Sequence, residues 1–179
     1  MIKALKKIVL FLLFLAAVLV AVSVFLPPNY HVERSVVIMA RSDDIYPYVN
    51  NLKRWSEWSA WTTEKDPTAV YTFEGPEEGV GATMKWNGKK LGDGELTITE
   101  SNPQIAVRYD MTSNEGAMTS RGGFLFKMAG PGTKLVWVSD GELGSNPIHR
   151  YMGLLMERLI GPDFDEGLKK LKRKIEGGK

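Results

Sequence analysis

The residue types that could carry out chemistry are few in this sequence, and they form no common catalytic or metal-binding motif. Its 179 residues include two histidines, His31 and His149, and no cysteine. Thiolate nucleophiles, disulfides and cysteine-ligated metals are therefore excluded, and two histidines do not suggest a histidine-rich metal centre. The nucleophile motif Gly-x-Ser-x-Gly is also absent. We therefore assign no catalytic residues, and we expect no metal site and no cofactor.

Charged residues in the second half of the chain could be recruited into an acid–base mechanism. They are Arg108, Asp110, Arg121, Asp140 and Glu142. In an alternating strand, Arg108 and Asp110 point away from the apolar residues beside them. We interpret these charges as solvated cross-strand pairs, and His149 as a surface residue at the start of a helix.

Aromatic and methionine side chains share one parity along the expected strands and one face of the last helix. Such side chains make an adaptable apolar lining, although a filled core would show the same pattern. The predicted ligand-binding residues are Trp58, Trp61, Met84, Trp86, Tyr109, Met111, Phe124, Trp137, Met152 and Met156.

Three tryptophans, Trp55, Trp58 and Trp61, lie at three-residue spacing, which places neighbours on one helical or 3₁₀ face. They could be core anchors where a helix meets a sheet. They could instead form a pocket rim, where the indole N–H groups would orient a ligand.

These side chains must be positioned by an α+β domain with one antiparallel sheet. Short strands bounded by Gly, Pro and Asn turns follow one another without intervening helices, which favours a meander over βαβ units. The expected strands are residues 31–40, 70–73, 82–86, 96–99, 105–111, 124–128 and 135–138. One or two short helices fill residues 42–58. A long amphipathic helix follows from Pro147, with a kink or break at Gly161-Pro162, and it must cover the sheet.

The N-terminal segment contains a 19-residue apolar run, residues 8–26, in which Ser23 is the only polar residue. At about 1.5 Å per residue this helix spans a bilayer core of about 30 Å. A cleaved signal peptide is the alternative, but signal h-regions are usually shorter, so we favour a retained anchor. We expect residues 1–28 to be a cytoplasmic tip and transmembrane anchor, and residues 29–179 to be the ligand-binding domain.

The charge distribution sets the expected orientation. Lys3, Lys6 and Lys7 precede the apolar run, and all 21 acidic residues follow it. The positive flank indicates a cytoplasmic N-terminus and a domain on the extracytoplasmic side of the cell membrane. The remaining 20 basic residues nearly balance the acidic ones, so no nucleic-acid partner is expected.

The element order and three motifs resemble the polyketide cyclase/dehydrase and lipid-transfer group of the START-like (SRPBCC) superfamily. The first motif is the tryptophan cluster of residues 55–61, followed by Asp66-Pro67. The second is the glycine turn and strand of residues 79–86. The third is the sequence of residues 161–172, GPDFDEGLKKLK.

This resemblance implies a helix-grip fold, in which a curved sheet wraps the long helix and leaves a tunnel for apolar ligands. The favoured function is a membrane-anchored binding module for a hydrophobic or amphipathic, lipid-like small molecule. An enzyme of the cyclase/dehydratase type, using Tyr109 and a carboxylate in the tunnel, is the first alternative. A protein-interaction domain of the same fold is the second.

Overall fold

The computed structural model describes residues 2–113, 116, 118–144 and 146–177. Its helical elements are α1 (Ile2–Ser23), α2 (Ser42–Asn50), the 3₁₀ helix η1 (Leu52–Glu57), α3 (Pro147–Gly153) and α4 (Met156–Gly177). Its strands are β1 (Asn29–Ile38), β2 (Val70–Glu74), β3 (Thr83–Gly88), β4 (Gly92–Asn102), β5 (Ala106–Ser113), β6 (Met118–Ala129) and β7 (Gly132–Glu142).

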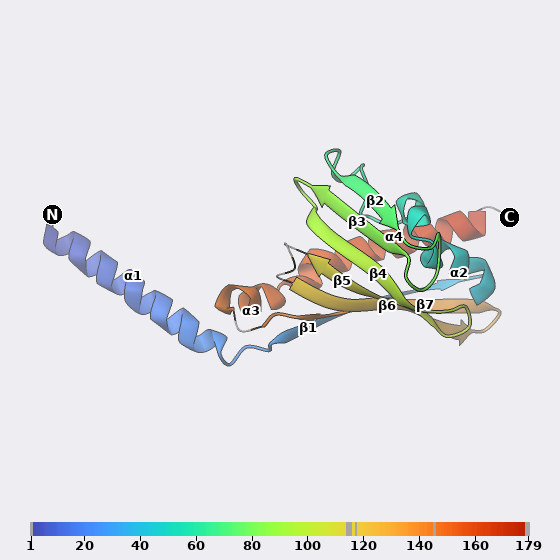
Figure 1. Cartoon of the computed structure of the whole chain (residues 1–179). Helices are drawn as coiled ribbons and strands as arrows, with labels where there is room; N and C mark the ends of the chain where they lie inside the picture. The colour runs from blue at the N-terminus through green and yellow to red at the C-terminus, as the bar shows by residue number, and fades with distance from the viewer. Residues whose placement is uncertain (1, 114–115, 117, 145, 178–179) are drawn as a thin grey trace.

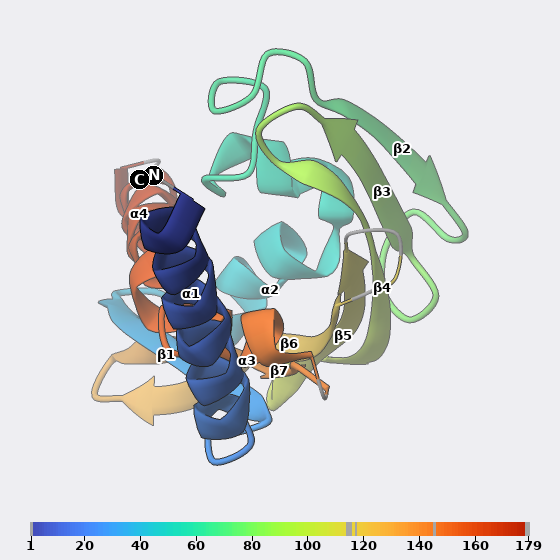
Figure 2. The same cartoon turned by 90° about the vertical axis from the view of Figure 1, so that its left-hand side faces the viewer.

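The strands form one antiparallel sheet in the order β1-β7-β6-β5-β4-β3-β2. Strands β2 to β7 are a meander, and β1 pairs with β7, with His31 opposite Asp140. Figure 2 shows the sheet as an arc from β1 to β2, with α4 near the β1 end. The predicted α+β helix-grip architecture is therefore confirmed.

The last helix departs from the sequence prediction. The helix is interrupted at Leu154 and Leu155, which form a turn between α3 and α4. Helix α4 then continues without a break through Gly161 and Pro162. Of the predicted kink or break at Gly161-Pro162, the break was wrong, because α4 is one helix through both residues. Phe164, further along the apolar face of α4, is buried, and tertiary packing of this face favours a continuous helix although Pro162 cannot donate a backbone hydrogen bond.

The end of the domain around α2 and η1 has a solid aromatic core. Trp55 and Trp58 are buried, and their indole N–H groups donate to the carbonyl oxygens of Val49 and Tyr48 at 3.1 and 3.0 Å. Both tryptophans are therefore core anchors that join η1 to α2. Their rings also pack edge-on against Phe124.

Helix α1 extends away from the domain, from the end where α3 lies (Figure 1). Residues Leu5–Ser23 form the one helix in the described ranges that is long and apolar enough to cross a membrane. The side chains of this span are exposed along its length, except that Ser23 at its end is buried. The same properties fit a membrane anchor and a signal sequence.

Candidate ligand-binding cavity

A cavity of about 400 Å³ lies between the inner face of the sheet and the N-terminal half of α4. It occupies the end of the sheet where β1 begins and β7 ends, beyond the aromatic core. The helical side supplies Met152, Met156, Leu159, Ile160 and Phe164, and Trp61 comes from the loop after η1. The sheet supplies Tyr30, Tyr71, Met84, Trp86, Met111, Met118 and several hydroxyl residues, and the β3–β4 turn supplies Lys90 and Leu91. The lining is therefore mainly apolar.

Cross-strand glycines help to leave this space open. Gly94 is opposite Trp86, and Gly141 is opposite Tyr30. A Cβ at either glycine would overlap the ring of its partner, so each ring lies flat over the neighbouring strand. An aromatic ring that lies flat occupies less of the interior than one standing away from the sheet. The glycines therefore contribute to the cavity without lining it.

Two residues of the cavity lining, Tyr71 and Ser120, have buried hydroxyl groups without a hydrogen-bond partner among the described residues. Tyr71 Oη and Ser120 Oγ are inaccessible to solvent and make no hydrogen bond to any described residue. Burial raises the pKa of Tyr71, and the nearby Asp66 carboxylate adds to this, so the phenol stays neutral and can donate. Because an unpaired buried hydroxyl is costly, these two groups mark positions where a ligand could form hydrogen bonds.

The β3–β4 turn at the cavity edge is held by Asp66, whose side chain is buried. Its Oδ2 accepts hydrogen bonds from the backbone N–H groups of Lys90 and Leu91 at 2.7 and 3.0 Å. Its Oδ1 accepts from the Thr68 hydroxyl at 2.6 Å. The Thr68 hydroxyl and these backbone donors hold the pKa of Asp66 well below its usual range. Asp66 therefore remains charged and positions Lys90, which is the one ionisable group of Lys, Arg, Asp, Glu or His type among the described lining residues.

Six of the ten predicted binding residues line the cavity: Trp61, Met84, Trp86, Met111, Met152 and Met156. The other four, Trp58, Tyr109, Phe124 and Trp137, are not in the lining and belong to the solid core. The binding role of all ten residues stays a prediction, and the structure places these four outside the cavity lining. Side-chain parity identifies the face of a strand, but it does not say where along the strand the core ends and the cavity begins.

Tyr109 illustrates the difference. Its ring lies over Gly122 of the neighbouring strand, and its hydroxyl accepts a hydrogen bond from Trp137 Nε1 at 2.9 Å. Burial raises the pKa of Tyr109, so the group stays protonated. Trp137 in turn stacks on Phe164 with ring centroids 3.9 Å apart. Tyr109 is therefore a core residue, and it is not placed to act on a molecule in the cavity.

Sequence reasoning missed several lining residues, including Tyr30, Tyr71, Leu91 and Ser120. Tyr71 lies on a short strand that was predicted, but nothing in the sequence indicated that its side chain would line a cavity together with residues of α4. Asp66 was noted only as part of the Asp66-Pro67 motif. An acidic residue before a proline was its only local signal.

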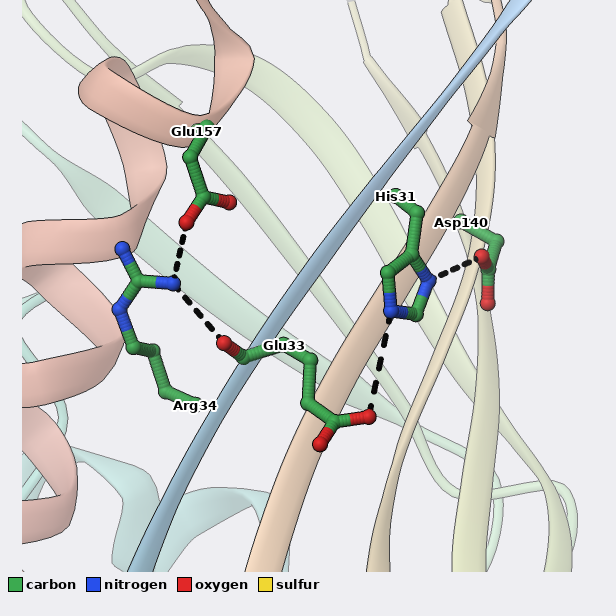
Figure 3. Close-up of polar contacts among 5 residues, drawn as sticks. All are labelled: His31, Glu33, Arg34, Asp140 and Glu157. Carbon is green, nitrogen blue, oxygen red and sulfur yellow. Dashed lines mark hydrogen bonds and ion pairs between the residues drawn. The ribbon is translucent and has the colours of Figure 1, made fainter.

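Charged contacts on β1 fasten the helical wall of the cavity (Figure 3). Arg34 donates to Glu157 at 2.5 Å and to Asp165 at 3.0 Å, which ties β1 to the first half of α4. A Cβ at Gly161 would overlap the Arg34 guanidinium, so the glycine lets this side chain pass beside the helix. Gly161 thus has a packing role in an unbroken helix.

The charged residues of β5 and β6 that could have been recruited into an acid–base mechanism lie on the solvent side of the sheet. Arg108 pairs with Glu100 at 3.0 Å, and Arg121 pairs with Asp110 at 3.8 Å, all four being largely exposed. This confirms the interpretation of Arg108, Asp110 and Arg121 as solvated cross-strand pairs. Figure 3 shows His31 beside Asp140, where Nδ1 and Oδ1 are 2.7 Å apart.

A second hollow of about 690 Å³ lies at the same end of the sheet, and exposed charges such as Arg121 and Asp140 form part of its wall. It is the larger of the two, but a solvated charged wall does not retain an apolar molecule. We therefore take the first cavity as the candidate site. Among the described residues, no group of three or more His, Asp or Glu side chains is arranged to hold a metal ion.

Comparison with known proteins agrees with this architecture. A family model described as "Polyketide cyclase / dehydrase and lipid transport" matches residues 30–176. No curated protein matches the sequence.

Solved structures share the fold at low sequence identity. A protein in the dynemicin biosynthetic locus, DynU16, is 16% identical with a TM-score of 0.57, over 83% of this chain and 48% of that one. The di-domain ARO/CYC StfQ from the steffimycin biosynthetic pathway is 13% identical with a TM-score of 0.61, over 83% and 51%. A protein from Thermobifida fusca is 15% identical with a TM-score of 0.61, over 81% and 92%. The chain therefore spans about half the length of the first two.

Proposed function

Because the chain belongs to the polyketide cyclase/dehydrase and lipid transport family, we propose that it is a membrane-anchored binding module for a hydrophobic or amphipathic small molecule. Residues 1–28 form the cytoplasmic tip and transmembrane anchor. Residues 29–179 form the ligand-binding domain on the extracytoplasmic side. The ligand occupies the cavity between the sheet and α4, and no metal or cofactor takes part.

The observation that carries this proposal is an apolar cavity whose lining includes two residues, Tyr71 and Ser120, with buried and unpaired hydroxyl groups. An apolar ligand body would bury its surface against the methionine and aromatic side chains, at roughly 25 cal/mol per Å². Carbonyl or hydroxyl groups on the ligand would pair with Tyr71 Oη and Ser120 Oγ. A lipid-like molecule with a few polar groups satisfies both requirements. A cavity of about 400 Å³ is within the range of small-molecule sites.

The second candidate is an enzyme of the cyclase/dehydratase type acting in the same cavity. Family membership and the fold shared with an ARO/CYC protein favour it. Against it, Lys90 is the single ionisable group of Lys, Arg, Asp, Glu or His type in the described lining, so no carboxylate or imidazole is present there to act as a base. General acid–base catalysis needs positioned groups within hydrogen-bond reach of the reacting atoms. A binding module needs no such acid–base groups.

Native mass spectrometry of the full-length protein, released from detergent, tests the binding function. We expect a bound small molecule in the wild type and its loss in Met152→Trp, where the larger side chain enters the cavity. Met128→Trp is the matched control, because Met128 is fully exposed on β6 outside the lining. Equal retention by both variants, or a wild type that binds no apolar molecule, would contradict the proposal.

Fractionation tests the anchor. The full-length protein should stay in membranes after an alkaline wash, and a reporter fused to the C-terminus should be active only outside the cytoplasm. A soluble product that begins near Val24 would instead identify residues 1–23 as a cleaved signal peptide.

A further inference from the structure

Helix α3 is fastened to the end of α1. Arg150 donates from Nη1 to the carbonyl oxygens of Ser23 and Val24 at 3.2 and 3.1 Å. The Tyr151 hydroxyl donates to the Leu19 carbonyl oxygen at 2.9 Å. A guanidinium at the last carbonyls of a helix also complements the negative end of its dipole. These contacts join two segments more than 120 residues apart in the sequence, and they place α3 beside the last turns of α1 (Figures 1 and 2).

The chain from α3 into α4 exposes large apolar side chains close together in the sequence, which we call the mouth face. It consists of Ile148, Met152, Leu154, Leu155 and Leu159, which are between 37% and 69% exposed. Met152 and Leu159 also line the cavity. The mouth face is therefore the outer continuation of the cavity wall. Five neighbouring large apolar side chains are an unusual patch for a domain surface in water.

We propose that the mouth face lies in the bilayer interface, so that the cavity opens toward the lipids. This inference rests on the proposed membrane anchor. The span Leu5–Ser23 ends where α3 is attached, so α3 sits at the depth where α1 leaves the hydrocarbon core. Tyrosine and arginine are suited to that depth, since each has an apolar body and a polar tip, and Tyr151 and Arg150 provide these groups. An apolar helix face at this level is covered by lipid instead of water.

The occupant of this surface is thus the lipid bilayer, and the ligand would exchange between the bilayer and the cavity past Met152 and Leu159. The attachment to α1 distinguishes this surface from other exposed apolar residues. Met128, which is 96% exposed, lies at the far end of the sheet, because β1 and β7 run about 30 Å from the α1 end to the β6–β7 turn.

The absence of cysteine makes a direct test possible, since each introduced cysteine is unique in the chain. Full-length Leu155→Cys, Met128→Cys and Leu12→Cys are labelled with an environment-sensitive fluorophore. They are then reconstituted in vesicles of phosphatidylcholine and phosphatidylglycerol. Doxyl-labelled lipid serves as the membrane quencher and iodide as the aqueous quencher. Leu155 is exposed and outside the cavity lining, so its label reports on the surface.

We expect doxyl lipid to cause a loss of fluorescence at positions 12 and 155 but not at 128, and iodide to quench position 128 alone. Lipid quenching at 12 with iodide quenching at 155 would overturn the inference and leave the anchor standing. Protection of position 155 from both quenchers would also overturn it, since a protein partner or a second copy would then cover the face. Lack of lipid quenching at position 12 would refute the anchor and the inference together.

Discussion

Replacing Tyr71 by phenylalanine removes one hydroxyl group from the cavity wall and leaves the ring in place. Tyr71 Oη is buried and makes no hydrogen bond to a described residue, so its burial carries a cost in the ligand-free protein. In the complex the same group would pair with the ligand. We therefore expect opposite effects, a rise in the free energy of unfolding of the free protein and a loss of ligand affinity.

The two magnitudes follow from the partners of the hydroxyl. An unpaired buried hydroxyl costs about 1–3 kcal/mol, and we take about 1 kcal/mol because Tyr71 as a whole is only partly buried. This corresponds to a rise in Tm of about 2–4 °C for a chain of this size. Loss of one hydrogen bond to the ligand costs about 0.5–1.5 kcal/mol, which is roughly a two- to tenfold weaker affinity.

The assay pairs thermal unfolding of the detergent-solubilised protein with displacement of a fluorescent fatty acid. Tyr46→Phe is the matched control, because the Tyr46 hydroxyl pairs with Ser101 Oγ at 2.6 Å outside the cavity. That change should lower the Tm by a few degrees and leave affinity unaltered. A lower Tm in Tyr71→Phe with unchanged affinity would refute the reasoning, since the hydroxyl would then have a structural partner.

Three further outcomes are expected. The folded-state pKa of Asp66 lies below its unfolded value, so its contribution to stability is present above about pH 4 and is lost as pH falls further. Acid unfolding of Asp66→Asn should therefore show a weaker dependence on pH than the wild type in that range, and an unchanged dependence would contradict the assignment. Arg34→Met should lower the free energy of unfolding by about 1 kcal/mol in thermal unfolding, because its partners Glu157 and Asp165 are half exposed. Arg121→Met, at an 85% exposed site, is the control and should have almost no effect. The single changes His31→Ala and His149→Ala should leave fatty-acid displacement unaltered, because neither residue lines the cavity; a specific turnover lost in either variant would favour the enzyme.

Much of the fold could be predicted because its signals are local. Alternation in residues 105–111 and the turns between strands predicted a meander, and β5 is an interior strand of that sheet. Local signals failed at Gly161-Pro162, where the sequence predicts a break but Arg34 packs against the glycine and burial of Phe164 holds the helix together. Arg34 and Gly161 are more than 120 residues apart in the chain, so no rule based on neighbouring residues could predict their contact.

The candidate site was predicted in part for the same reason. Parity assigned Trp86 and Tyr109 alike to the inner face, and both rings do lie over cross-strand glycines. Only Trp86 borders the cavity, because the aromatic core around η1 fills the interior as far as Tyr109. Position along the strand relative to packed helices decides between core and cavity, and periodicity carries no information about it.

Composition and periodicity were sufficient to predict the apolar N-terminal segment, the meander, the amphipathic last helix and the absence of thiol chemistry, because each of these is a property of neighbouring residues. Three features could be found only in the folded chain: where the inner face is filled and where it is open, which hydroxyls are left unpaired, and the attachment of α3 to the end of α1. These features depend on which distant residues meet. Which distant residues meet depends on how the whole sheet packs against α4, through contacts such as Arg34 with Asp165 and Trp137 with Phe164.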